Sequence, residues 1–355
     1  LLAAIGIGLA VMQREAATQQ INLQSKDTLY KSTLRSVRER LYHGDVQAAQ
    51  RLLQGYEASN AWEWRHLSSL ADQSTHTIIF KDGAIRDFAP MSAGQIVCMT
   101  LSGNVRYLTA EGGVWTETGL TDGVLLPMAI SPEGDYALGL NREGQSVIHT
   151  LDHAEQLAPM ILADSPATYN KVSPSGRYIL IGTNSGEFLL YDTNTSALIH
   201  REPRATGNLV ACFSDDDRSL VWYDKAYKVL DLETLSSNVI NAGVLGRGSP
   251  RSMAAIGGTL FTAMGDGAVL KCTIDGMAEV SEIARLSDEI ATIAASPDGN
   301  TIACGDSDGA IHLIEDTEAV TVLRGHTSPI TKLVFSGDGH QLYSLASRSC
   351  VIRAV

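Results

Sequence analysis

The sequence lacks the short motifs by which most active sites are recognised. It contains no G-x-x-x-x-G-K-[ST] or G-x-G-x-x-G phosphate loop, no H-E-x-x-H zinc helix and no G-x-S-x-G nucleophile turn. The kinase motifs H-R-D and D-F-G are also absent. Of the nine histidines only His149 and His153 lie four residues apart, where a strand passing into a turn would separate them. We therefore expect no catalytic residues, no cofactor and no metal in this chain.

Cysteine is scarce, and its spacing does not indicate a metal or redox site. Five cysteines occur in 355 residues, the count is odd, and no two of them form a C-x-x-C pair. Each lies in or beside an apolar run, so we expect small buried side chains and no disulfide framework. The five are Cys98, Cys212, Cys272, Cys304 and Cys350.

Positive charge is also in short supply. The net charge is −13 at pH 7, and residues 67–355 carry 34 of the 40 acidic side chains but only 19 of the 27 basic ones. An acidic surface repels phosphate backbones, which predicts no nucleic-acid binding and favours protein or peptide partners. The acidic run Asp215-Asp216-Asp217 falls at a turn, where we expect it to be solvated.

The sequence does contain a turn motif that recurs seven times, about every 41 residues. Proline can lead such a turn, and glycine supplies the positive φ that follows. A period of roughly 40–45 residues with four strands per unit is typical of a β-propeller. The segments are Met-Ser-Ala-Gly at 91–94, Ser-Pro-Glu-Gly at 131–134, Ser-Pro-Ser-Gly at 173–176, Ser-Asp-Asp-Asp at 214–217, Ala-Ala-Ile-Gly at 254–257, Ser-Pro-Asp-Gly at 296–299 and Ser-Gly-Asp-Gly at 336–339.

Short β-rich runs separate these turns. The sixth repeat is the clearest, with expected strands at 290–296, 301–305, 310–315 and 320–323. The last repeat stops at its third strand, over residues 350–355, and an additional strand over residues 75–80 precedes the first repeat. That strand can complete the last blade and leave no open sheet edge. We predict an all-β fold, a seven-bladed β-propeller over residues 75–355.

The repeats resemble the WD40 family. The seventh repeat reads Leu-Arg-Gly-His-Thr-Ser-Pro-Ile-Thr-Lys-Leu-Val-Phe-Ser-Gly-Asp-Gly from residue 323, and Tyr191-Asp192 stands where the family has Trp-Asp. The resemblance implies a buried network of His, Ser or Thr, Asp and Trp in each blade, with His326 and Asp308 as structural members. No Trp-Asp dipeptide occurs, and Arg348-Ser349-Cys350 replaces a turn that should end in glycine. Most blades are therefore expected to lack the full network.

An uncharged apolar run opens the chain. Residues 1–12 are shorter than the ~20 residues that span a bilayer, and we interpret them as the C-terminal part of a transmembrane helix. The tail of a signal peptide and a buried soluble helix are the alternatives. Residues 13–74 then form a predicted juxtamembrane helical region. Its stripe of Leu23, Tyr30 and Val37 has heptad spacing, which indicates either a helix lying on the propeller or a homodimer contact.

Two further helices are expected before the repeats. Asp45 is a suitable N-cap for a helix over Val46–Gln54, and a third helix starts near Asn60. Trp62 and Trp64 in the third helix cannot face the same side. We expect them to act as structural residues, one against the propeller and the other against the preceding helices.

Partner contacts are expected on the rim where the innermost strands begin. Positions four residues before the turn serine project there, namely Asp87, Tyr169 and Lys332, with Arg86 and Arg251 nearby. Tyrosine and arginine are over-represented at interface hot spots.

The order of the segments resembles bacterial membrane-anchored Ser/Thr protein kinases with C-terminal WD40 repeats. The matching residues are Gly-Asp-Val-Gln-Ala-Ala-Gln-Arg-Leu-Leu from 44 and Trp-Glu-Trp-Arg from 62. The resemblance implies a non-catalytic, single-pass, extracytoplasmic propeller at a cell membrane that acts as a protein-interaction or sensory platform, with any kinase domain upstream. The alternatives are a free-standing secreted or anchored adaptor and an enzyme with its active site in the central channel.

Overall fold

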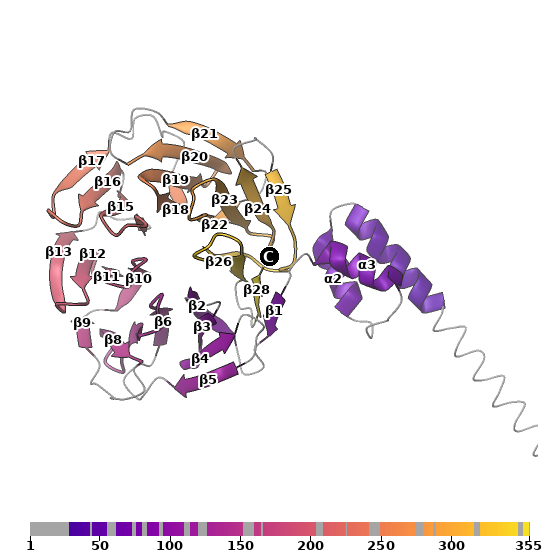
Figure 1. The fold of residues 1–355 in the computed structure, drawn as a ribbon, viewed down its shortest axis with the longest axis horizontal. Coiled ribbons are helices and arrows are strands. Elements are labelled where there is room, and N and C mark those ends of the chain that lie inside the picture. The colour runs from indigo at the N-terminus through magenta and orange to yellow at the C-terminus, as the bar shows by residue number, and fades with distance from the viewer. Residues whose placement is uncertain are drawn as a thin grey trace, which may run out of the picture. The chain divides into compact units, whose positions relative to one another are not determined.

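A computed structural model shows a chain made of two compact units, Leu1–Gln73 and Ser74–Val355 (Figure 1). Residues 28–42, 45–54 and 62–72 are the described residues of the first unit, and all other described residues belong to the second unit. The structure describes residues 28–42, 45–54, 62–72, 76–79, 84–91, 95–109, 114–119, 126–151, 160–164, 166–203, 209–224, 226–240, 249–274, 280–286, 289–315, 320–346 and 351–354.

The first unit is helical, with helical residues 28–42 followed by α2 (Val46–Gln54) and α3 (Trp62–Ala71). Asp45 caps α2 as predicted, because its Oδ1 accepts a hydrogen bond from the Ala48 amide at 3.2 Å. Its Oδ2 also accepts one from Arg40 Nη1 at 2.8 Å, which ties α2 to the preceding helix. The bounds predicted for α2 are confirmed.

The apolar stripe of residues 28–42 packs inside this unit. Val37 is fully buried in a cluster with α2 and α3, and Tyr30 packs against the same cluster. The Trp64 ring stacks on Tyr30 at 6.3 Å between centroids, so one of the two tryptophans packs on the preceding helix as expected. The Trp62 side chain and residue Leu23 lie outside the described residues. The heptad spacing therefore needs no second copy of the chain to explain it.

Residues 1–12, the predicted part of a transmembrane helix, lie outside the described residues. Within the part of the chain that the structure describes, no helix is both long enough and apolar enough to cross a membrane.

The second unit is an all-β propeller, as predicted, and its described strands form seven four-stranded antiparallel sheets (Figure 1). We number these sheets along the chain as blades 1 to 7. Blade 1 comprises β2 (Ile85–Met91), β3 (Gln95–Thr100), β4 (Asn104–Thr109) and β5 (Val114–Gly119), and blade 2 comprises β6 (Leu126–Ile130), β7 (Tyr136–Leu140), β8 (Ser146–Thr150) and β9 (Met160–Ala163). Blade 3 comprises β10 (Ala167–Val172), β11 (Tyr178–Thr183), β12 (Glu187–Asp192) and β13 (Ala197–Pro203), and blade 4 comprises β14 (Val210–Phe213), β15 (Ser219–Asp224), β16 (Ala226–Asp231) and β17 (Ser237–Ile240). Blade 5 comprises β18 (Pro250–Ile256), β19 (Thr259–Met264), β20 (Ala268–Thr273) and β21 (Ser281–Arg285), and blade 6 comprises β22 (Ile290–Ala295), β23 (Thr301–Asp306), β24 (Ile311–Glu315) and β25 (Val320–Leu323). Blade 7 comprises β26 (Ile330–Phe335), β27 (Leu342–Ala346) and β28 (Val351–Ala354) together with β1 (His76–Ile79).

The first strand completes the last blade. β1 pairs with β28 in antiparallel register, from His76 opposite Ala354 to Ile79 opposite Val351. The order of that sheet, β1-β28-β27-β26, places β1 at its outer edge. The closure predicted from the spare strand is confirmed, and it joins the two ends of the propeller.

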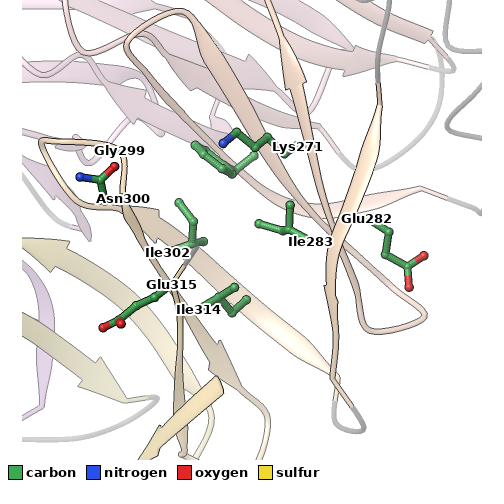
Figure 2. Close-up of a pocket in the computed structure, with 9 residues that line it drawn as sticks. Lys271, Glu282, Ile283, Gly299, Asn300, Ile302, Ile314 and Glu315 are labelled. Atoms are coloured by element: carbon green, nitrogen blue, oxygen red, sulfur yellow. The ribbon is translucent and has the colours of Figure 1, made fainter. Parts of the chain in front are cut away.

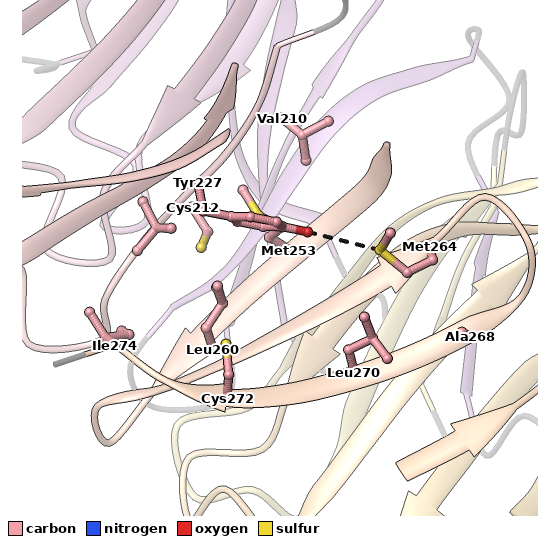
Figure 3. Close-up of a cluster of buried hydrophobic side chains, with 11 residues drawn as sticks. Val210, Cys212, Tyr227, Met253, Leu260, Met264, Ala268, Leu270, Cys272 and Ile274 are labelled. Atoms are coloured by element: carbon pink, nitrogen blue, oxygen red, sulfur yellow. Dashed lines mark hydrogen bonds between the residues drawn. The ribbon is translucent and has the colours of Figure 1, made fainter. Parts of the chain in front are cut away.

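Apolar side chains fill the spaces between neighbouring blades. Between blades 4 and 5, for example, Tyr227 and Val221 pack against Leu260, Met264 and other buried residues, several of them sulfur-containing (Figure 3). The Tyr227 hydroxyl lies 3.9 Å from the Met264 sulfur. Because these clusters alternate with the sheets around the ring, each blade is held by its two neighbours and the strands that begin each blade surround the centre (Figure 1).

Candidate partner-binding surfaces

The recurring turn is stabilised by its own side chains. In blade 6 the Ser296 hydroxyl donates to Asp298 Oδ1 at 2.5 Å and accepts from the Thr301 amide at 2.9 Å. Gly299 then adopts a φ of +73°, which a residue with a Cβ atom rarely does. The turns that begin at residues 214 and 336 repeat the serine–aspartate pattern. Each turn is thus specified locally, and for this reason it is visible in the sequence.

The same turns also connect neighbouring blades. The Tyr136 hydroxyl of blade 2 donates to the Gly176 carbonyl of blade 3 at 2.6 Å, and burial together with nearby carboxylates raises its pKa. In the next two junctions Asp217 accepts from Ser173 at 3.0 Å, and Asp215 accepts from the Gly257 amide at 2.9 Å. Asp215 and Asp216 are exposed, in line with the predicted solvation, whereas Asp217 is half-buried. Asp215 and Asp217 nevertheless join blades 3, 4 and 5, which the prediction did not include.

At the opposite ends of the innermost strands, Asp87 and Lys332 join blades 7, 1 and 2. Lys332 Nζ of blade 7 donates to Asp87 Oδ1 at 2.5 Å and to the Phe88 carbonyl at 2.7 Å. Asp87 Oδ2 accepts from the Ile130 amide of blade 2 at 3.0 Å. Asp87 is only 8 % exposed, so its carboxylate is satisfied by contacts inside the ring.

Tyr169 makes a comparable contact between blades 3 and 4. Its hydroxyl lies 3.1 Å from both the amide and the carbonyl of Ala211, and burial raises its pKa. Ser252 of blade 5 likewise accepts from the Ile293 amide of blade 6 at 3.3 Å. The innermost strands are sheet edges with unpaired backbone groups, and these side chains satisfy some of those groups. The predicted contact of Asp87, Tyr169 and Lys332 with a partner remains a prediction, while their observed contacts hold the ring together.

The two predicted arginines are exposed on the rim. Arg251 forms an ion pair with Glu289, with Nη2 and Oε1 2.7 Å apart, and so links blades 5 and 6 at the surface. Arg86 is exposed, and among the described residues it has no hydrogen bond or ion pair. Of the predicted set, Arg86 is therefore the side chain most available to a partner.

Two leucines accompany Arg86 on this rim, and sequence reasoning missed both. Leu101 is 53 % exposed and its amide bonds to the Ala84 carbonyl, beside Arg86. Leu126 is 56 % exposed and begins β6, which contacts both β2 and β3. We call Arg86, Leu101 and Leu126 the rim patch. Leu101 lies in a turn and Leu126 at the start of a strand, where a sequence pattern does not distinguish exposed leucine from core leucine.

The polar network expected for these repeats is present in part. His326 Nε2 lies 2.8 Å from Ser344 Oγ, and both residues are buried. In blade 6 the buried carboxylate is Asp306, whose Oδ2 lies 2.8 Å from His312 Nε2. Asp308, the residue predicted for this role, is exposed. Asp306 was missed because it ends a strand two residues before the expected position.

Asp306 is held in its ionised form by its surroundings. Burial opposes ionisation, but the hydrogen bond with His312 and those from the Ala310 and Asp308 amides lower the pKa of the carboxyl below its ordinary value. The local backbone is also constrained, because Gly309 has a φ of +92° and packs against the loop of His326.

Metal ligation and thiol reactivity were the two kinds of chemistry that histidine and cysteine side chains could have supplied. Within them, no group of three or more His, Cys, Asp or Glu side chains is placed to hold a metal ion. The four described cysteines are buried and form no disulfide, and burial raises the pKa of the Cys272 thiol to about 11. A neutral thiol is a poor nucleophile and a poor metal ligand.

Comparison with known proteins identifies WD40 repeats at the C-terminal end of the chain. The family described as WD domain, G-beta repeat matches residues 281–315 and 317–353. These segments correspond to the strands from β21 to β28, that is, the end of blade 5 and blades 6 and 7. No curated protein matches the chain. The matched segments include the Asp306–His312 and His326–Ser344 pairs described above.

Proposed function

We propose that this chain is a non-catalytic interaction platform that binds a protein partner through the rim patch. WD40 propellers are typically scaffolds that bind proteins, and the two matched repeats support that general role. The observation that carries the proposal is the exposure of Leu101 and Leu126 beside Arg86. Their neighbours Asp87 and Lys332 are already used in the ring, so the rim patch offers contacts that the fold itself does not need.

The rim patch can be tested by affinity capture with the full chain. We compare the wild type with an Arg86→Glu/Leu101→Asp variant, using Val239→Asp as the matched control. Val239 is 68 % exposed on β17, at the outer edge of blade 4, and lies far along the ring from the rim patch. Proteins that the wild type and the control both retain should be lost from the rim variant. If the three chains retain the same proteins, the rim patch is not the binding surface.

We further propose that the apolar run of residues 1–12 tethers the chain to a membrane and that the propeller is extracytoplasmic. The support is the absence of any charged side chain in that run. Membrane fractions of the source cells should retain the full chain after carbonate extraction and lose a chain without residues 1–12. Protease added to intact cells should cleave the propeller. Release by carbonate, or protection from the protease, would contradict this placement.

The segment order also supports a place at the C-terminal end of a receptor-like Ser/Thr kinase. The support is the resemblance of Gly44–Leu53 and of Trp62-Glu-Trp-Arg65 to the segments that precede the repeats in that group. Mass spectrometry of the protein purified from its own cells should find kinase-domain peptides on the same polypeptide as residues 76–354. A mature polypeptide without them would instead identify a free-standing adaptor.

A further inference from the structure

One lysine stands at a position that apolar or tyrosine side chains occupy in the other blades. In blades 1 to 6 a residue of the third strand pairs with a core residue of the second strand and faces the next blade. In blade 5 that residue is Lys271, opposite Phe261. The residues in the other five blades are Tyr107, Ile148, Leu190, Val229 and Leu313. A charged group has thus replaced a core-type side chain at one of the six junctions.

A pocket of about 210 Å³ opens at this junction, between blades 5 and 6 (Figure 2). Its apolar wall consists of Phe261, which is buried in the inter-blade core, and three isoleucines. Between blades 1 and 2 the corresponding residue, Tyr107, closes the space by donating its hydroxyl hydrogen to the Gly134 carbonyl at 2.7 Å. Lys271 makes no such contact with Gly299, the corresponding turn glycine, and the space stays open. The three isoleucines are Ile283, Ile302 and Ile314.

The Lys271 amine is not neutralised by the described part of the chain. Its Nζ lies 5.7 Å from the centroid of the Phe261 ring, and among the described residues it has no hydrogen bond or ion pair. The two carboxylates at the pocket, Glu282 and Glu315, point away from the isoleucines (Figure 2). Glu282 is bound by Arg285 through two hydrogen bonds of 2.8 and 3.1 Å. The pocket therefore combines an apolar wall with an available positive charge.

At the junction between blades 3 and 4 a lysine over an aromatic ring is paired with a carboxylate. Lys228 Nζ in blade 4 also lies 5.7 Å from an aromatic centroid, that of the buried Trp222. There the amine is paired with the carboxylate of Glu202, which arrives from the outer strand of blade 3. The lysine, ring and carboxylate form one compact polar–apolar contact. At Lys271 the lysine and the ring are present, but no carboxylate of the described residues pairs with the amine.

We propose that the pocket between blades 5 and 6 binds a segment of a partner protein that presents a large apolar side chain next to a carboxylate. The apolar side chain enters against Phe261 and the isoleucines, and the carboxylate pairs with Lys271. The volume fits this occupant, because drug-sized ligands fill pockets of roughly 300–1,000 Å³ and a smaller space suits a single side chain. This inference rests on the proposed role in protein binding and adds a second surface, separate from the rim patch.

The test is a comparison of peptide selections. A displayed library of random twelve-residue peptides is selected on the full wild-type chain, on Lys271→Met and on Lys228→Met. The Lys271→Met variant should fold, because the other blades carry apolar or tyrosine residues at this position, and its melting temperature is measured to verify this. Lys228→Met is the matched control, since it removes a lysine at the same distance from an aromatic ring.

We expect the wild type and the Lys228→Met control to enrich peptides with Asp or Glu beside Leu, Ile, Phe or Met. Lys271→Met should not enrich them, and its affinity for a peptide selected on the wild type should fall at least tenfold by fluorescence anisotropy. Replacing the acid in that peptide by its amide should lower wild-type affinity to a similar extent. Absence of enrichment, enrichment of basic peptides, or equal binding by Lys271→Met would overturn the inference. If the rim variant still loses a captured protein in that case, the proposed function stands and only the pocket is excluded.

Discussion

Two glycines at corresponding turns allow the contribution of one close contact between blades to be measured. Gly186 in blade 3 and Gly309 in blade 6 both precede the third strand and have φ values of +82° and +92°. A Cβ atom at Gly186 would have no neighbour within 4 Å, whereas one at Gly309 would lie 2.7 Å from the His326 carbonyl oxygen and 2.9 Å from that of Ser328. An alanine therefore meets the same backbone strain at both sites and a collision at only one.

The expected losses of stability differ accordingly. A left-handed conformation costs an alanine about 1–2 kcal/mol, and the smaller entropy of the unfolded chain offsets part of that, which leaves about 1 kcal/mol for Gly186→Ala. Overpacking against backbone adds about 1–3 kcal/mol, so Gly309→Ala should lose about 3 kcal/mol. At about 2 °C per kcal/mol for a domain of this size, the melting temperature should fall by about 2 °C and about 6 °C respectively.

Differential scanning calorimetry of the full chain and both variants measures these shifts. Because the two substitutions are chemically identical, the difference between them isolates the packing of the blade 6 turn against the loop that begins blade 7. Equal shifts would refute the reasoning, since they would show that the loop of His326 moves aside at no cost.

Three further substitutions test polar contacts inside the ring. Lys332→Met leaves the buried Asp87 carboxylate without its cation, and we expect the free energy of unfolding in urea to fall by about 1–3 kcal/mol. An unchanged free energy of unfolding would show that solvent replaces the lysine as the partner of Asp87. Asp306→Asn should be less stable than the wild type at pH 7, and the gap should close as the pH falls below about 4, because a carboxyl with a lowered pKa stabilises the fold only while it is ionised. A gap that is constant with pH would show that the charge of Asp306, next to His312, is irrelevant. Tyr136→Phe removes one inter-blade hydrogen bond and should lower the melting temperature by about 2 °C, whereas an unchanged value would mean that the bond makes no net contribution.

The features that could be predicted from the sequence are those set by local chemistry. The turn at Ser296 is specified by residues within five positions of one another, so its recurrence indicated a propeller. The outer strand β25 and the closing strand β1 followed from counting strands between turns. Asp45 was identified as a helix cap because its acceptor role depends on an amide only three residues away.

The features that could not be predicted depend on how blades face one another. Asp215 and Asp217 look like a solvated acidic run in the sequence, yet their partners lie one repeat away in each direction. Lys271 is unremarkable until its position is aligned with those of the other blades. The burial of Asp306 rather than Asp308 depends on the residue at which β23 ends, and a motif match does not fix that position to within two residues.

The closure of the ring has a mechanical consequence. Tension transmitted from the helical unit reaches the propeller at His76, and β1 is held to β28 by a ladder of four residue pairs. Every other blade is formed by strands that follow one another in the sequence. Among the described strands, β1 and β28 are therefore the only pair that joins the first part of the propeller to the last. Force applied to the chain on the N-terminal side of His76 therefore acts directly on the pairing of β1 with β28. The force that detaches β1 is the force at which blade 7 is left with three strands.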